Sequence, residues 1–227
     1  MMNKEQVEQL ILNEFMAVPF HSLYFYLRRR PVSLAYGGTC SDKVLHLYSK
    51  LLELGVKVQL QTSYMNDVES HRLLLIKIGG IDYIADIGNG WPSIKMFPTN
   101  EDYTYCAFGV GFHSRIFDDH VKIYREIDGF KKLVVDVPTV VKDEALIMRD
   151  IECRFNKDNN GPFLDTVRFG QVVGDRYLYL KDKTLFVYAE EQGLEVISMD
   201  GLSLFEIIDQ YFYFDTKGFM EKSIALL

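Results

Sequence analysis

The hydrophobic pattern of this chain changes its period at Gly55, and that change limits the folds the chain can adopt. Before Gly55, apolar residues recur at helical spacing in two segments, 3–16 and 41–54, and the second segment stops at the glycine. After it, short runs alternate apolar and polar residues, as in VKVQLQTSY at 56–64, which is typical of strands. Helices followed by strands predict an α+β fold and argue against alternating βαβ units.

The segments after residue 64 predict an antiparallel sheet or small barrel, followed by a mixed region. Strands are expected at 105–112, 119–127 and 130–137, and Asp128-Gly129 between the last two is a strong hairpin signal. The later elements are expected as a helix at 143–157, a loop at 156–162, a hairpin turning at 181–183 and a helix near 202–212. Because no linker separates these segments, we expect one packed unit.

The charge of the chain argues against a surface that binds polyanions. The net charge is -7, and acidic and basic residues are interspersed along the sequence, so we expect no nucleic-acid partner. Glu5, Glu8 and Glu14 interrupt the apolar residues of the N-terminal segment, which therefore lacks the apolar region of a signal peptide. Since no run of about 18 apolar residues occurs either, we expect no membrane partner and a cytoplasmic location.

The three cysteines, Cys40, Cys106 and Cys153, have no paired spacing. Such an odd and sparse set fits neither a disulfide framework nor a zinc site, so we expect a reducing compartment and no metal. Cys106 and Cys153 lie in apolar periodic runs and are expected in the core. Cys40 differs from them, because it follows the sequence GGT and precedes the helix predicted at 41–54.

Cys40 admits two interpretations. A lone cysteine after a turn is most often a small apolar residue of the interior. At the N-terminus of a helix, however, oriented N–H groups stabilise a thiolate, and an adjacent imidazolium stabilises it more strongly. Gly37 and Gly38 lack a Cβ and leave room for a substrate to approach. A partner histidine therefore decides between the two interpretations.

Among the five histidines we favour His71, which begins the apolar run HRLLLIKI. Gly79-Gly80 follows that run and is typical of the two central residues of a tight hairpin. In that register Leu73 pairs with Asp86, and Leu73 lies on the same sheet face as His71. Asp86 is then a diagonal neighbour of His71 within side-chain reach. A register slip of one residue would place Asp86 on the opposite face, so the predicted triad depends on this turn.

Taken in order, these motifs resemble the arylamine N-acetyltransferase family, whose members use a cysteine-histidine-aspartate triad. The family's two glycines, variable residue and cysteine are met by GGTC, and its histidine and aspartate motifs by HRLLLIKI and ADIGNGWP at 85–92. AVPF at 17–20, residues 156–187 and LFEIIDQYFYFD at 204–215 resemble further family motifs. The resemblance covers most of the chain and is that of a divergent, short member.

The resemblance implies an α+β fold of three parts packed as one unit around a cysteine-protease-like, or transglutaminase-like, core. A helical part, 1–55, would carry the nucleophile, and an antiparallel β-barrel, 56–142, would carry the histidine and the aspartate. Residues 143–227 would form a mixed α/β C-terminal lid part. In this arrangement Cys40 is the acylated nucleophile, His71 its base and Asp86 the acid that orients the base.

The implied reaction moves an acetyl or other acyl group from a coenzyme A thioester, such as acetyl-CoA, to an amine, arylamine or hydrazine. It passes through an acyl-cysteine and uses no metal. Asn89 falls where an aromatic wall of the family's amine pocket is expected. Asn89 and Trp91 are both predicted to bind substrate, although Trp91 could instead pack at the sheet end. The chain departs from the family at Tyr36 and His21, where members commonly have an arginine and a glutamate.

Two other functions stay open from the sequence. A transglutaminase-like or protease-like cysteine hydrolase or amide synthase would use the same triad, and a catalytically inactive relative would keep it as a relic. The sequence defines neither the acyl donor and the acceptor amine nor the oligomeric state.

Overall fold

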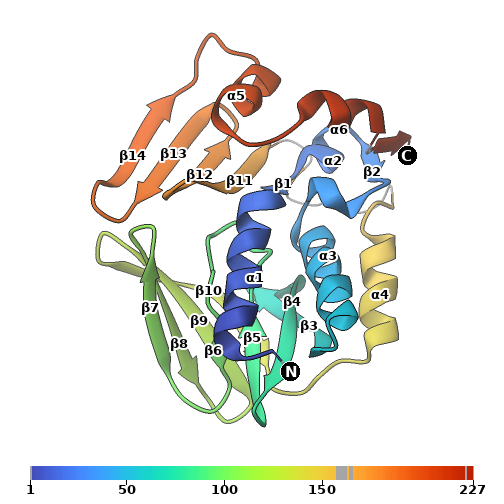
Figure 1. Ribbon diagram of the computed structural model, residues 1–227, viewed down its shortest axis with the longest axis vertical. Coiled ribbons are helices and arrows are strands. Elements are labelled where there is room, and N and C mark those ends of the chain that lie inside the picture. The colour runs from blue at the N-terminus through green and yellow to red at the C-terminus, as the bar shows by residue number, and fades with distance from the viewer. Residues whose placement is uncertain (1, 157–162, 164–165, 223, 227) are drawn as a thin grey trace.

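The computed structural model of the protein describes residues 2–156, 163, 166–222 and 224–226. Its helices stand beside a curled antiparallel sheet, and a smaller sheet lies across one end of both (Figure 1). The helices are α1 (Lys4–Ala17), α2 (Leu23–Tyr26), a 3-10 turn η1 (Leu34–Tyr36), α3 (Cys40–Glu53), α4 (Glu144–Cys153), α5 (Leu204–Tyr211) and α6 (Thr216–Lys222).

The curled sheet has eight strands in the order β6-β5-β4-β3-β10-β9-β8-β7 and forms a nearly closed barrel. Its strands are β3 (Lys57–Met65), β4 (Val68–Ile78), β5 (Ile81–Ala85), β6 (Phe97–Pro98), β7 (Tyr103–Ala107), β8 (Val110–Ile116), β9 (His120–Ile127) and β10 (Phe130–Pro138). The predicted α+β class with an antiparallel barrel is confirmed.

The smaller sheet has five strands in the order β1-β11-β12-β13-β14. These are β1 (Phe20–His21), β11 (Arg168–Val173), β12 (Arg176–Lys181), β13 (Thr184–Ala189) and β14 (Gly193–Ser198). A further pair joins β2 (Arg29–Pro31) to β15 (Ile224–Leu226). The predicted hairpin at 181–183 is confirmed by the pairing of Lys181 with Thr184, whereas the short strands β1, β2 and β15 were not foreseen.

The hairpin at Gly79-Gly80 has the predicted register. Lys77 pairs with Asp82 and Leu74 with Ala85, as two central turn residues require. Both glycines have positive φ, 59° and 89°, which other residues adopt only at a cost. This turn therefore fixes which side chains of β4 and β5 share a face.

Two sequence predictions are wrong. The single strand expected at 105–112 is broken by a turn at Phe108-Gly109, both at positive φ, and becomes β7 and β8. Cys106 and Cys153 are exposed and not in the core. On β7 the alternation of side chains buries Tyr105 and turns Cys106 outward. The apolar runs hid this, because a run without clear alternation does not show which face is buried.

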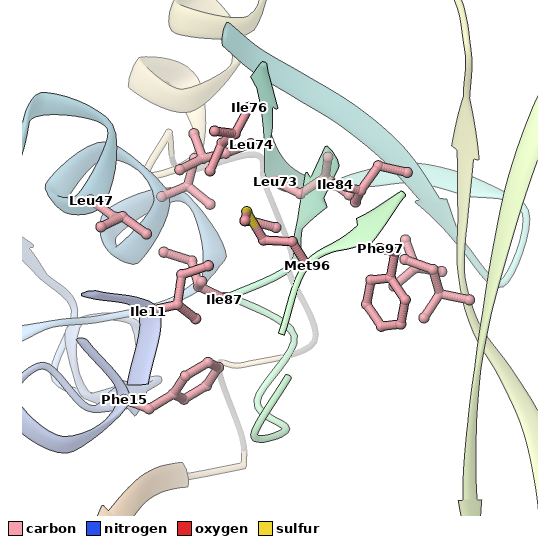
Figure 2. Packing of buried hydrophobic residues seen from close by; sticks show 14 of the residues in the cluster. Ile11, Phe15, Leu47, Leu73, Leu74, Ile76, Ile84, Ile87, Met96 and Phe97 are labelled. Carbon is pink, nitrogen blue, oxygen red and sulfur yellow. The ribbon is translucent and has the colours of Figure 1, made fainter. Parts of the chain in front are cut away.

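The main core lies between the helices and the barrel. Helix α3 packs on β3 and β4, and α4 packs on β3. Figure 2 shows Ile11 of α1 and Leu47 of α3 gathered with Leu74 of β4, Ile87 and Met96 in one apolar layer. A second cluster joins β11, β12 and β13 to α2, α5 and α6.

The loop predicted at 156–162 lies, apart from its first residue, outside the described residues. No helix among the residues described is both long and apolar enough to cross a membrane.

Candidate active site

Helix α3 begins at Cys40 because the residues before it cap the helix. Thr39 is the N-cap, and the Asp42 carboxylate accepts hydrogen bonds from the Thr39 backbone N–H and hydroxyl at 3.0 and 3.2 Å. Asp42 is fully buried and also forms an ion pair with Arg154 at the end of α4. The first turn of α3, which carries the Cys40 thiol, is therefore held from two sides.

The two glycines before Thr39 permit close backbone contacts. A Cβ on Gly38 would collide with the Asp42 side chain, and one on Gly37 would collide with the Pro19 carbonyl. The Gly38 backbone instead pairs with β1, accepting a hydrogen bond from the His21 N–H at 2.8 Å. The glycines thus serve to pack the loop before Cys40 against the segment that follows α1.

His71 and Asp86 lie together as the hairpin register predicts. His71 Nε2 lies 2.7 Å from Asp86 Oδ1, and both side chains are buried. Since a carboxylate only accepts, Nε2 donates, and Nδ1 is the ring nitrogen left for Cys40. The carboxylate therefore fixes both the orientation and the tautomer of the imidazole.

Cys40 and His71 form a hydrogen-bonded pair with shifted proton affinities. Burial by itself raises the pKa of the Cys40 thiol, but the hydrogen bond and charge of His71 outweigh it and leave this pKa below its usual value. The Arg72 backbone N–H also donates to the sulfur. Burial disfavours the imidazolium of His71, yet Asp86 and Cys40 together raise the pKa of His71 to about 10. Both shifts favour the thiolate–imidazolium form of the pair.

Gly88 brings the loop after β5 into contact with Cys40. A Cβ placed on Gly88 would lie only 2.6 Å from the Cβ of Cys40. The absence of a side chain at this position lets the segment that carries Asp86, directly after β5, approach the nucleophile from one side. His71 of β4 approaches it as well, so the three side chains meet at the junction of helix and barrel.

Asn89 contacts Asp86 directly. Its side-chain Nδ2 donates to Asp86 Oδ2, and its Oδ1 accepts from the Trp91 N–H at 2.8 Å. Asn89 therefore fixes the second oxygen of the carboxylate and the start of the Trp91 segment. This arrangement was not foreseen, although an asparagine that accepts from the backbone N–H two residues on is a common turn motif and offered a signal for the contact with Trp91.

Trp91 packs in an aromatic cluster at the junction of the barrel with the small sheet. Its ring stacks on Tyr179 with centroids 5.4 Å apart and meets Tyr188 edge-on at 5.5 Å. The guanidinium of Arg125 lies 3.5 Å from the centre of the Trp91 ring. Arg125 was missed in the sequence, although it interrupts an alternation of buried apolar residues on β9.

The other histidines have structural partners. His46, His113 and His120 lie within 3.0 Å of carboxylates of Glu14, Glu126 and Asp136 respectively. Within the described ranges no group of three or more histidine, cysteine, aspartate and glutamate side chains is placed to hold a metal ion.

Solved structures share the overall fold of this chain. The arylamine N-acetyltransferase of Mycobacterium tuberculosis aligns with a TM-score of 0.82 and 16% identity, covering 97% of this chain and 90% of that one. The chain has the arylamine N-acetyltransferase fold. The protein of the same name from Salmonella typhimurium gives 0.81 and 16%, with coverage of 93% and 85%. The Mycobacterium marinum structure in complex with CoA gives 0.78 and 15%, with 92% and 84%.

This fold confirms the resemblance to arylamine N-acetyltransferases that the sequence predicts. It also confirms the predicted cysteine-protease-like core. A scan against protein-family models and a search of curated proteins find no match. The likeness is therefore a likeness of three-dimensional structure, with little sequence identity left to support it.

Proposed function

We propose that this protein transfers an acetyl or other acyl group from a coenzyme A thioester to an amine, arylamine or hydrazine, with Cys40 as nucleophile. The observation that carries the proposal is the hydrogen-bonded set of Cys40, His71 and Asp86 at the N-terminus of α3, in which the pKa shifts of Cys40 and His71 favour a thiolate. A structural cysteine of the interior is inert and needs no histidine and aspartate to lower its pKa. The fold shared with arylamine N-acetyltransferases, one of them in complex with CoA, supports the choice of acyl donor.

In the first half-reaction the Cys40 thiolate attacks the carbonyl carbon of the thioester. The tetrahedral intermediate collapses, the bond from carbon to the CoA sulfur breaks, and the departing thiolate takes a proton from His71. Backbone N–H groups at the start of α3 are suited to stabilise the negative oxygen of the intermediate, as helix N-termini do. The products are acyl-Cys40 and free CoA, with His71 neutral.

The second half-reaction needs His71 as a base. The hydrogen bond and the charge of Cys40 contribute to the raised pKa of His71, and acylation removes both. The pKa of His71 then falls, and the imidazole can take a proton from the attacking amine. Collapse of this second intermediate releases the amide and restores the thiolate. The same residue thus acts as acid and base because acylation changes its charged neighbour.

Asp86, Asn89 and Trp91 act around this pair. Asp86 keeps the imidazole in the tautomer that faces Cys40. Asn89 positions Asp86 through its amide. We further propose that Asn89 and Trp91 border the acceptor, since both belong to the loop that follows Gly88, and Gly88 touches Cys40.

The test is mass spectrometry of the intact protein after incubation with a panel of acyl-CoA thioesters. We expect one acyl group, lost in Cys40→Ser and released as amide when an arylamine or hydrazine is added. Cys106→Ser and Cys153→Ser are matched controls, because both thiols are exposed and neither touches the candidate triad. These two variants should acylate like the native protein.

Other outcomes would favour the other functions. An acyl-Cys40 that decays to free acid at the same rate with and without amine would favour a hydrolase. If no thioester of the panel acylates Cys40, and iodoacetamide labels it like an ordinary thiol, the protein is an inactive relative and the proposal is wrong.

A further inference from the structure

The inward-facing positions of β9 are apolar with one exception. Val121 and Ile123 point into the core and are almost completely buried, and Arg125 is the next residue on that face. Arg125 pairs with Phe112 of β8 on one side and Lys132 of β10 on the other, so it lies inside the sheet and not at an edge. A cation on the inner face of a barrel strand carries a desolvation cost that calls for a partner.

The guanidinium of Arg125 lies on the face of Trp91, 3.5 Å from the ring centre. Trp91 is itself held between Tyr179 and Tyr188, and the Tyr177 hydroxyl donates to the carbonyl of the preceding residue, Gly90. Stacking of this kind fixes the plane of a guanidinium while leaving its N–H edges free. The cation is therefore positioned before any ligand arrives.

Arg125 has no acidic partner among the residues that the structure describes. The adjacent carboxylate, Glu126, faces the other side of the sheet and is engaged by His113 at 3.0 Å and by Lys131 at 3.6 Å. No nitrogen of Arg125 is among the buried polar atoms that lack a partner, so its donors reach solvent. Burial lowers the pKa of Arg125, and the nearby tyrosines Tyr188, Tyr179 and Tyr177 oppose this shift only in part.

This cation belongs to the surroundings of the candidate triad. The backbone N–H of Trp91 donates a hydrogen bond to the Asn89 side chain, and the Asn89 amide donates one to Asp86. We propose that Arg125 is a specificity residue that binds an oxyanion carried by a substrate, either a carboxylate of the acyl acceptor or a phosphate of the CoA donor. The inference rests on the proposed acyl transfer. A planar fork of N–H donors matches both groups with two parallel hydrogen bonds.

The chain offers a direct probe, because Trp91 is its single tryptophan. Ligand binding at Arg125 changes the surroundings of the only indole, so titration of intrinsic fluorescence reports on this site. Cys40→Ser serves as the background, which prevents turnover. Benzoate is compared with benzamide for the acceptor side, and CoA with pantetheine, which lacks the phosphates, for the donor side.

In that background we expect Arg125→Met to weaken binding of one anion about 10- to 100-fold, as for loss of a charged hydrogen-bond partner, and to leave its neutral analogue unchanged. Methionine keeps an apolar contact with Trp91. Arg125→Lys should retain part of the affinity, because it keeps the charge without the fork. Arg115→Met is the matched control, because it removes an exposed arginine of β8 that pairs with Asp102. This variant should bind all four ligands as the Cys40→Ser background does.

The pattern of losses identifies the source of the oxyanion. Loss confined to benzoate assigns Arg125 to the acceptor, and loss confined to CoA assigns it to the donor. Equal binding of charged and neutral ligands before mutation, or an Arg125→Met protein that binds both anions unchanged, overturns the inference. Because these are binding measurements, a protein that prefers anions yet never acylates Cys40 would refute the proposed transfer and leave the role of Arg125 standing.

Discussion

Replacement of Gly88 by alanine tests whether the approach of the β5 loop to α3 creates the reactive thiolate. The backbone at Gly88 does not have positive φ, so alanine is not strained by conformation. The new Cβ would lie 2.6 Å from the Cβ of Cys40, and closer still to its Cα. Since ordinary contacts between carbon atoms begin near 3.5 Å, the loop or the helix must retreat by about 1 Å.

A displacement of that size separates Cys40 from His71, because Asp86 holds the imidazole on the barrel side. Without the imidazolium, the thiol returns towards an ordinary pKa of about 8.5, at which a few per cent is ionised at pH 7. The fraction of thiolate then falls by roughly thirtyfold. Acyl transfer would fall further, by about 100-fold, because the nucleophile is also misplaced.

The assay is the rate of Cys40 alkylation by iodoacetamide between pH 5 and pH 10, read by mass spectrometry. The native protein should react at lower pH than an ordinary thiol, since its thiol pKa is lowered. Gly88→Ala should follow an ordinary thiol and reach the native rate only above about pH 9. Gly129→Ala, whose Cβ meets open space at φ 76°, is the control: it costs about 1 kcal/mol of stability but leaves alkylation unchanged. A folded Gly88→Ala protein with the native pH profile would refute the reasoning.

Three further changes have defined outcomes. Burial lowers the pKa of His21 to about 3. Between pH 6.5 and pH 3 the histidine is therefore protonated in the unfolded chain and neutral in the folded one, so the free energy of unfolding decreases as the pH is lowered through this window. His21→Asn should remove about 2 kcal/mol of the stability lost between pH 7 and pH 5 in urea unfolding, and an unchanged pH dependence would contradict this. Asp86→Asn should lower acyl transfer about 10⁴-fold by favouring the wrong imidazole tautomer, whereas a loss below tenfold in a steady-state assay would exclude that role. Tyr177→Phe leaves the buried Gly90 carbonyl without its donor and should cost about 1–3 kcal/mol in the same urea assay; a stability equal to native would show that water replaces the hydroxyl.

The part of the site that could be predicted from the sequence is the part that one hairpin determines. Gly79-Gly80 allows a two-residue turn, and that turn fixes the register of β4 against β5. Register then decides that His71 and Asp86 share a face, because side chains alternate with a period of two. The N-terminus of α3 was equally visible, since Thr39 and Asp42 form a local cap.

The part that could not be predicted depends on contacts between distant segments. Nothing in the local sequence places Arg154 of α4 against Asp42, or Trp91 between Arg125 and the small sheet. The prediction that Cys106 and Cys153 are buried failed for a related reason. Cys106 lies in an apolar run, and only the pairing of β7 with β8 shows that it faces outward.

In the loop before Cys40, the side chain of His21 and the backbone carbonyl of Tyr36 brace the turn. Where members of the resembled family commonly have an arginine and a glutamate, His21 Nε2 donates to the Tyr36 carbonyl at 2.9 Å, and Nδ1 accepts from the Leu23 N–H. The neutral ring lies among aromatic side chains and stacks on Phe169. A neutral hydrogen bond in such a pocket avoids the desolvation cost of a buried ion pair. The His21–Tyr36 hydrogen bond can therefore hold the loop before Cys40 without a buried charge. The chain keeps the fold of the Mycobacterium tuberculosis protein, at a TM-score of 0.82, although only 16% of the residues are identical.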